Sequence, residues 1–271
     1  METDLLQYAA QLNEGGASCL ASGNHCAAFE YFRNTLELLL LYNAHGSVIL
    51  ASSPFLHAAA LSLLSEPIAY HNILLSERVS NADNCSIVNS QQQEQQQQQL
   101  TSHNKVSTNR HLFTKAFVFQ PKEDLTRDDH VRVRTYIAIL FFNMATTIHQ
   151  TRAYSGDDED DNGANCSNGD ELALQVALQL YNVGFDLLIQ EESSCMDDWA
   201  TNINLAALNN MSQCHYALSD FAKASRILDL QKSLLQIIFT NKRPHNFSEQ
   251  EMELFVLNTH LLKTPTAASA A

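Results

Sequence analysis

The chain has 271 residues, of which 45% are apolar, and its 16 Lys and Arg residues against 30 Asp and Glu residues give a formal net charge of −14. The apolar content is too high for a fully disordered chain and is ordinary for a soluble globular protein. The acidic balance disfavours direct contact with nucleic acid or an anionic membrane, because their phosphates would be repelled. Part of the acidic excess is local, since residues 153–171 carry seven acids and no base.

Sequence signals for secretion and for enzyme chemistry are lacking. Six cysteines are scattered without a CxxC pair, which favours free thiols in a reducing compartment. The first residues, "METDLLQYAAQ", lack the basic start of a signal peptide, and no stretch resembles a membrane span of roughly 20 apolar residues. We therefore expect a cytoplasmic or nuclear protein. No P-loop, GxSxG, GxGxxG or HExxH motif occurs, so we assign no catalytic residue, cofactor or metal ligand and expect a non-enzymatic protein.

The N-terminal part predicts a helical hairpin over residues 4–43. Residues 4–22 and 25–43 both show apolar residues at intervals of three and four, as one face of a helix requires. Between them, Gly23 suits the left-handed position after a helix end, and Asn24 is a good N-cap. A further helix is expected at 52–67, where Pro54 occupies the first turn and Pro67 ends the pattern.

The composition then changes. Residues 81–110 are rich in Ser, Asn and Gln, with a glutamine tract at 91–99, and are predicted to be a disordered insertion. The aromatic-rich stretch "HLFTKAFVFQP" at 111–121 is predicted to be extended and to pair, as a small β-hairpin, with residues 72–80.

The remainder of the chain is expected to be helical. Hairpins are predicted at 127–190 and 197–240, the first of them interrupted by a disordered acidic insertion at 153–169. A terminal helix at 248–262 has a clear start, because Ser248 and Glu251 have capping-box spacing and Phe247 and Met252 are placed for a hydrophobic staple. Residues 263–271 are expected to form a flexible tail, so that residues 1–262 make a single domain.

Small residues recur at matching positions in these hairpins. One set consists of three small residues and a bulky one: Gly16, Gly23, Ala28 and Phe32. About two hundred residues later, a second set has identical spacing and the same order of small and bulky residues: Ser212, Ser219, Ala224 and Leu228. A split third copy places Phe141, Met144, Ala145 and Ile148 before the acidic insertion, and Ala177 and Tyr181 after it. Small side chains let two antiparallel helices approach closely, and insertions are tolerated in the turns between them. The sequence therefore predicts stacked helical hairpins.

This pattern resembles the tetratricopeptide repeat family, whose consensus runs W-x2-L-G-x2-Y, then A-x3-F, then P. The first half reads Leu12-x2-Gly15-Gly16-x2-Cys19, Phe141-x2-Met144-Ala145-x2-Ile148 and Leu208-x2-Met211-Ser212-x2-His215, and the second half reads Ala28-x3-Phe32, Ala177-x3-Tyr181 and Ala224-x3-Leu228. No copy has the Trp or the closing Pro, and the spacing between copies is far from a regular repeat. The expected fold is thus all-α, an array of antiparallel hairpins similar to tetratricopeptide repeats, with one small β-hairpin and disordered loops.

The resemblance implies a binding scaffold whose first helices line a concave groove. The groove candidates that it implies are Asn13, Asn143, Thr146, Gln150, Asn209, Asn210, Gln213 and Tyr216. Asn143 and Asn210 precede the Met-small pair of their copies, where the family often has an asparagine that holds an extended ligand backbone. A merely structural role, in which these amides satisfy neighbouring helices, is the alternative.

The candidates contain no basic residue, so capture of a C-terminal carboxylate is disfavoured and a neutral or basic protein or peptide segment fits better. The sequence favours neither nucleic acid nor membrane as a partner and leaves the oligomeric state open. A second hypothesis is a self-associating structural helical protein without a dedicated peptide groove, assembled through an apolar C-terminal helix face or the glutamine tract.

Overall fold

A computed structural model describes residues 2–46, 112–120, 129–155, 168–189, 198–241 and 245–261. Within these ranges the protein is all-α and contains no strand. The described helices are α1 (Glu2–Ala21), α2 (His25–Gly46), α6 (Asp129–Ser155), α7 (Asn168–Ile189), α8 (Asp198–Ala217), α9 (Phe221–Asn241) and α10 (Glu249–Leu261). The all-α prediction is confirmed.

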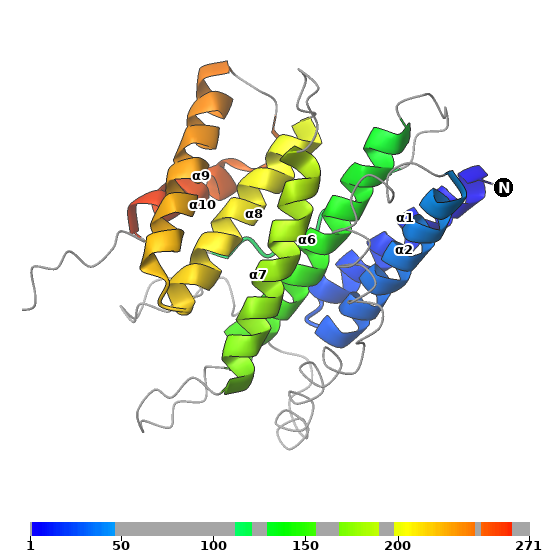
Figure 1. Cartoon of the computed structure of the whole chain (residues 1–271), viewed down its shortest axis with the longest axis horizontal. Helices are drawn as coiled ribbons and strands as arrows, with labels where there is room; N and C mark the ends of the chain where they lie inside the picture. The colour runs from blue at the N-terminus through cyan, green and yellow to red at the C-terminus, as the bar shows by residue number, and fades with distance from the viewer. Residues whose placement is uncertain are drawn as a thin grey trace, which may run out of the picture.

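Successive helices pack in pairs. α1 packs on α2, α6 on α7, and α8 on α9, while α2 also contacts α6, and α7 contacts α8. The pairs therefore lie side by side in chain order across the molecule (Figure 1). The last helix breaks this order, because α10 packs against both α8 and α9.

The turns of the first and last pairs have the same hydrogen bonds. Gly23 N–H donates to the Leu20 carbonyl at 3.0 Å and Asn24 N–H to Cys19 at 2.9 Å, while Ser219 N–H donates to Tyr216 at 3.0 Å and Asp220 N–H to His215 at 2.8 Å. These two bonds define the Schellman turn, which needs one residue with positive φ. Gly23 has φ 76° and Ser219 has φ 60°. The two turns therefore reverse the chain with the same backbone conformation, although only one of them contains glycine.

The residue after each turn caps the next helix. Asn24 Oδ1 accepts from Ala27 N–H at 3.3 Å, and Asp220 Oδ1 accepts from Lys223 N–H at 3.2 Å. Such caps satisfy one of the N–H groups that the first helical turn leaves free. Ser219, the sequence counterpart of Gly23, thus lies in a turn that is followed directly by the N-cap Asp220.

Small residues bring the paired helices together. A Cβ added to Gly16 would lie 2.5 Å from Cε1 of Phe32, which is fully buried, and one added to Gly184 would lie 3.1 Å from the Ala138 carbonyl oxygen. Apart from the exposed turn residues Gly23 and Ser219, the other recurring positions are also buried: Ala28, Phe141, Met144, Ala145, Ile148, Ala177, Tyr181, Ser212, Ala224 and Leu228. The contact between α1 and α2 at residues 16 and 32 therefore depends on the absence of a side chain at Gly16.

The predicted start of α10 is confirmed. Ser248 Oγ accepts from Glu251 N–H at 3.3 Å, and Glu251 Oε2 accepts from Ser248 N–H at 2.7 Å, which together form the capping box. Phe247 and Met252, placed for the staple, are both buried.

Several predictions need correction or fall elsewhere. The β-hairpin is not confirmed, because residues 112–120 contain no strand, and its other arm at 72–80 lies outside the described residues. The helix at 52–67, the insertion at 81–110 and the tail at 263–271 also lie outside them. The acidic insertion predicted at 153–169 is shorter at both ends, since α6 continues to Ser155 and α7 already begins at Asn168.

The expectation that no stretch resembles a membrane span needs correction, because Asp170–Ile189 in α7 is long and apolar enough to cross a membrane by length and composition alone. More than half of it is buried inside the protein, as in the core helix of a soluble domain, so the feature is weak evidence of a membrane span.

Candidate functional site

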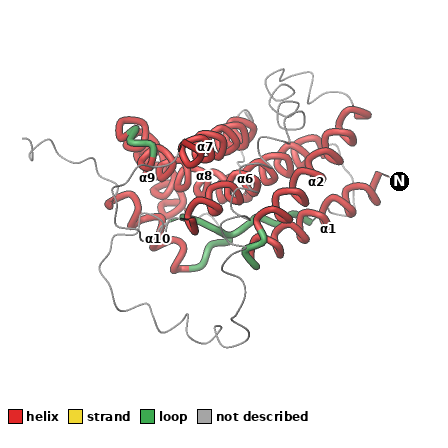
Figure 2. The backbone as a smooth tube through the Cα atoms, turned by 90° about the horizontal axis from the view of Figure 1, so that it is seen from below, coloured by secondary structure: helices red, strands yellow, loops and turns green. Residues whose placement is uncertain are grey.

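An irregular segment of the protein's own chain crosses the first helices of the three pairs. This internal segment, Leu112–Gln120, lies on the side of the molecule away from α7 and α9 (Figure 2) and bonds to side chains of α1, α6 and α8. The face that the resemblance assigned to a peptide ligand is therefore occupied by residues 112–120. We call it the groove face, defined by Asn13, Asn143, Gln150 and Asn210.

Asn143 binds both main-chain groups of a single residue of the segment. Phe117 N–H donates to Asn143 Oδ1 at 2.9 Å, and Asn143 Nδ2 donates to the Phe117 carbonyl at 2.9 Å. One residue presents its N–H and C=O on the same side when its backbone is extended, as it does toward a neighbouring strand. The amide of Asn143 therefore replaces a neighbouring strand at this point.

Asn13 on α1 supports this contact from the other side. Its Nδ2 donates to the same Phe117 carbonyl at 3.1 Å, and its Oδ1 accepts from Asn143 Nδ2 at 3.1 Å. Both asparagines are fully buried. A buried amide is costly unless it is hydrogen-bonded, so the pair both satisfies itself and fixes the orientation of each side chain.

Asn210 on α8 repeats the arrangement four residues earlier in the segment. Phe113 N–H donates to Asn210 Oδ1 at 3.0 Å, and Asn210 Nδ2 donates to the Phe113 carbonyl at 2.9 Å. Asn210 Nδ2 also donates to Tyr181 Oη at 3.0 Å, and that hydroxyl lies 3.1 Å from Thr146 Oγ1. Thr146 and Tyr181 thus hold the amide of Asn210 in the orientation that the segment requires.

Two further bonds extend the backbone contacts. Gln150 Nε2 donates to the Thr114 carbonyl at 2.7 Å, and Tyr136 Oη donates to the Gln120 carbonyl at 3.3 Å. Four predicted groove residues (Asn13, Asn143, Gln150 and Asn210) therefore contact the main chain of the internal segment directly.

The side chains of the segment are buried in aromatic surroundings. The Phe113 ring centroid lies 5.4 Å from that of Phe247, 5.7 Å from Phe255 and 6.1 Å from Phe142. Such spacings are those of packed aromatic pairs. Because Phe247 immediately precedes the N-cap of α10 and Phe255 lies in that helix, α10 closes one side of the site.

Phe117 and Phe119 occupy neighbouring positions. The Phe117 ring lies 5.0 Å from Phe142 and 6.3 Å from Trp199, and the Phe119 ring stacks on Tyr136 at 4.3 Å. Four apolar side chains of the segment are buried: Leu112, Phe113, Phe117 and Phe119. Backbone hydrogen bonds thus fix the register of the segment, and these side chains bury its apolar area.

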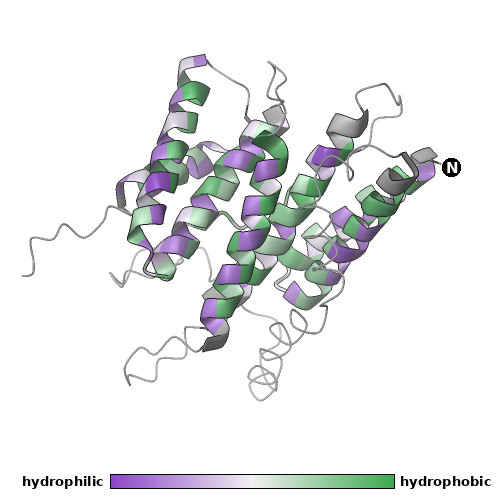
Figure 3. Ribbon diagram, in the orientation of Figure 1, coloured by the Kyte–Doolittle hydropathy of each residue, from purple (hydrophilic) through white to green (hydrophobic). Residues whose placement is uncertain are grey.

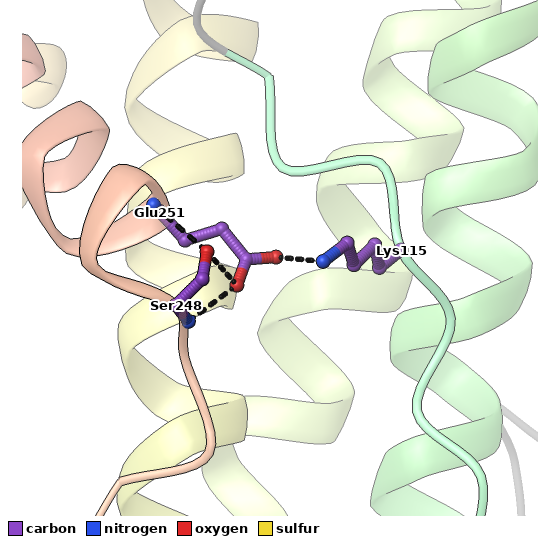
Figure 4. A network of polar contacts seen from close by, with 3 residues as sticks. All are labelled: Lys115, Ser248 and Glu251. Atoms are coloured by element: carbon purple, nitrogen blue, oxygen red, sulfur yellow. Dashed lines mark hydrogen bonds and ion pairs between the residues drawn. The ribbon is translucent and has the colours of Figure 1, made fainter.

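An ion pair joins the segment to α10. Lys115 Nζ lies 2.7 Å from Glu251 Oε1, while the other carboxylate oxygen of Glu251 completes the capping box with Ser248 (Figure 4). Burial alone would raise the pKa of Glu251, but the hydrogen bonds from Lys115 and Ser248 outweigh it, and the net pKa is lowered. Glu251 is therefore held ionised opposite the cation of the segment.

The remaining predicted residues have other contacts. Thr146 bonds to Tyr181 as described, and Asn209 Oδ1 accepts from Asn258 Nδ2 at 2.6 Å and from Gln231 Nε2 at 3.5 Å. Tyr216 packs edge-on against Phe221 at 5.2 Å. Gln213 is buried, and its Nε2 has no partner within the described part of the chain. Asn209 thus joins α8 to α9 and α10, the structural role that was the alternative reading.

Two titratable groups of α7 and α8, the Tyr181 hydroxyl and the Cys214 thiol, are buried. Burial raises the pKa of Tyr181 and favours its neutral hydroxyl. Cys214 Sγ lies 3.5 Å from His149 Nδ1, but both side chains are buried, so this thiol is not accessible to a substrate. In the same ranges no group of three or more His, Cys, Asp or Glu side chains is placed to hold a metal ion.

Sequence reasoning missed the aromatic half of the site. Phe142, Trp199, Phe247 and Phe255 enclose the segment, yet a helical apolar pattern gives no sign of which core residue faces a groove. The composition of "HLFTKAFVFQP" was the only signal for the segment itself.

No protein-family model matches this sequence, and comparisons with curated proteins and with solved structures find no match either. The relation to tetratricopeptide repeats therefore remains a prediction from the sequence pattern.

Proposed function

We propose that the protein is a non-enzymatic interaction scaffold, built as an array similar to tetratricopeptide repeats, which binds a neutral or basic peptide segment in extended conformation on its groove face. The observation that carries this proposal is the pair of asparagines, Asn143 and Asn210, each bonded to both main-chain groups of one residue. Main-chain recognition of this kind supplies affinity for an extended peptide independently of its sequence, while pockets for its side chains add specificity.

The charge of the bound segment supports the expected partner chemistry. Lys115 is the one charged residue among 112–120, and it pairs with Glu251. The four asparagine and glutamine residues of the groove face are uncharged, so a peptide carboxylate finds no cation among them. A neutral or basic segment is therefore the better fit, and the net charge of −14 favours its approach.

A displayed library of random twelve-residue peptides, selected against the full chain, tests this function directly. We expect the selected peptides to reduce hydrogen exchange on α6 and α8 around Asn143 and Asn210. The same selection on a Phe117→Ala chain, in which the internal segment is held less tightly, keeps the test valid when that segment competes strongly. Recovery of no groove-binding peptide from either chain would contradict the proposed function.

Self-association is the second candidate. On α9, Leu230, Ile237 and Phe239 are between 45% and 56% exposed, and hydrophobic residues interrupt the hydrophilic ones along this helix (Figure 3). Light scattering over a range of concentrations tests it. A mass that rises with concentration in the wild type, but not in a Leu230→Ser/Ile237→Ser variant, would support self-association through α9, whereas a constant monomeric mass would contradict it.

A further inference from the structure

The groove face already holds Leu112–Gln120, so any external peptide has to displace this segment before it reaches Asn143 and Asn210. This inference rests on the proposed function and specifies its partner and its regulation. We propose that the internal segment is a tethered competitor, and that the peptide which displaces it has aromatic side chains at its first, fifth and seventh positions and a basic side chain at its third.

The aromatic positions follow from the surroundings of the segment. The ring of Phe113 packs against the rings of Phe142, Phe247 and Phe255. The ring of Phe117 packs against those of Phe142 and Trp199. These flat and largely buried surfaces favour another ring, because a smaller side chain would leave part of each pocket empty. Phe119, stacked on Tyr136 and 2% exposed, defines the seventh position in the same way.

The spacing of the positions follows from the backbone. Asn210 holds Phe113 and Asn143 holds Phe117, so the two helices fix two extended residues four positions apart. A competing peptide that uses both asparagines therefore has to place its two rings at that separation. Lys115 lies midway and reaches Glu251, whose carboxylate is held in place by Ser248. This geometry places the basic side chain at the third position.

The tether explains why the competitor is effective. Eight residues, 121–128, separate Gln120 from the first residue of α6, so the segment stays close to the groove after release. A short link gives an effective concentration on the order of millimolar, against which a free peptide has to compete. Weakening the internal segment should consequently raise the apparent affinity for an external one.

Fluorescence anisotropy with a labelled peptide of the sequence HLFTKAFVFQP tests this proposal on the full chain. We expect the Phe117→Ala chain to bind the peptide at least about tenfold more tightly than the wild type, and the Lys115→Glu chain about threefold more tightly. Phe239→Ala is the matched control, since Phe239 is exposed on α9, and it should bind like the wild type. Because Lys115 is an exposed residue, its variant provides the test if Phe117→Ala fails to fold.

Peptide variants test the predicted positions. Replacing both the first and fifth aromatic residues by Ala should weaken binding at least about tenfold, and replacing the lysine by Glu should weaken it about threefold. Equal affinities of the wild-type and weakened chains, or of the peptide and its double-Ala variant, would overturn the proposal. If library peptides bind the groove but lack this aromatic and basic pattern, the proposed function stands and this inference fails.

Discussion

Replacing Asn143 by Ala should release the internal segment. Asn143 accepts from Phe117 N–H and donates to Asn13 Oδ1, and both of these groups lose that partner in the variant. The Phe117 carbonyl keeps its bond from Asn13 Nδ2 at 3.1 Å, so it is not orphaned. This single substitution therefore leaves two polar groups, the Phe117 N–H and Asn13 Oδ1, without the partner that Asn143 provided.

The magnitude follows from the burial of these groups. A buried donor or acceptor without a partner costs about 1–3 kcal/mol, so two such groups cost about 2–6 kcal/mol. The segment can leave the groove to rehydrate them, and in that case the cost appears as local opening rather than as global unfolding. Even about 2 kcal/mol corresponds to a roughly thirtyfold larger open population.

Hydrogen exchange of residues 112–120 measures the local opening of the segment, and urea unfolding measures the loss of global stability. Asn182→Ala is the matched control, because Asn182 is exposed on α7 and its Nδ2 bonds only locally, to the Leu178 carbonyl. We expect that control to change the free energy of unfolding by less than about 0.5 kcal/mol. If Asn143→Ala and Asn182→Ala give the same exchange and the same unfolding curve, the assignment of Asn143 as a backbone clamp is wrong.

Three further predictions concern the helix pairs and α10. Gly16→Ala should lower the free energy of unfolding by about 1–3 kcal/mol in urea, because its Cβ would overlap the buried Phe32 ring, and an unchanged midpoint would refute that close contact. Ser219→Gly should raise the stability by about 0.5–1 kcal/mol, because glycine adopts the positive φ of 60° without strain, and Gly23→Ser should lower the stability by a similar amount. Thermal unfolding in which Ser219→Gly is less stable, or Gly23→Ser more stable, than the wild type would contradict the shared turn conformation. Glu251→Gln keeps the capping box but removes the ion pair, so it should cost up to about 1 kcal/mol at neutral pH, whereas the exposed neighbour Glu249→Gln should be near neutral. The folded pKa of Glu251 is lowered, so the stabilisation from its carboxylate is complete above the ordinary pKa of 4.5 and is lost as the pH falls through the folded pKa. A stability difference between wild type and Glu251→Gln that does not change with pH would contradict an ionic origin of this stabilisation.

The sequence predicted the local features because each depends on a few neighbouring residues. The turn at Gly23–Asn24, its counterpart at Ser219–Asp220 and the capping box at Ser248 are fixed within six residues, and all are present as expected. The buried seams at Gly16 and Ala224 were predictable for a similar reason, since helical spacing determines which residues share a face.

The position of the internal segment was not predictable in this way. Its bonds join residues 97 positions apart, as in Phe113 to Asn210, or 104 positions apart, as in Phe117 to Asn13. The aromatic composition suggested an extended arm of a β-hairpin, but the extended residues Phe113 and Phe117 are paired by asparagine side chains instead of another strand. The local pattern predicted an extended stretch at 111–121, and only the tertiary contacts of residues 112–120 show what satisfies their backbone.

The identity of the groove residues was predicted in part. Asn143 and Asn210 were chosen from their equivalent positions in two copies of the pattern, and both contact the segment. Asn209 is the neighbour of Asn210, but Asn209 Oδ1 accepts from Gln231 and Asn258, and Asn209 Nδ2 donates to Asn210 Oδ1 and not to the segment. Adjacent helical positions point about 100° apart, so a one-residue difference separates a groove residue from a residue that joins two helices.

The occupied groove face can be tested most directly through Trp199, the single tryptophan of the chain. Its ring lies 6.3 Å from that of Phe117, so ring protons of the two residues should give a nuclear Overhauser cross-peak in the folded protein. We expect this cross-peak in the isotope-labelled wild-type chain, and we expect its Phe117 signal to weaken when the unlabelled peptide HLFTKAFVFQP displaces the segment. A folded protein in which Trp199 shows contacts to Phe142 or other helix residues, but none to Phe117, would contradict it.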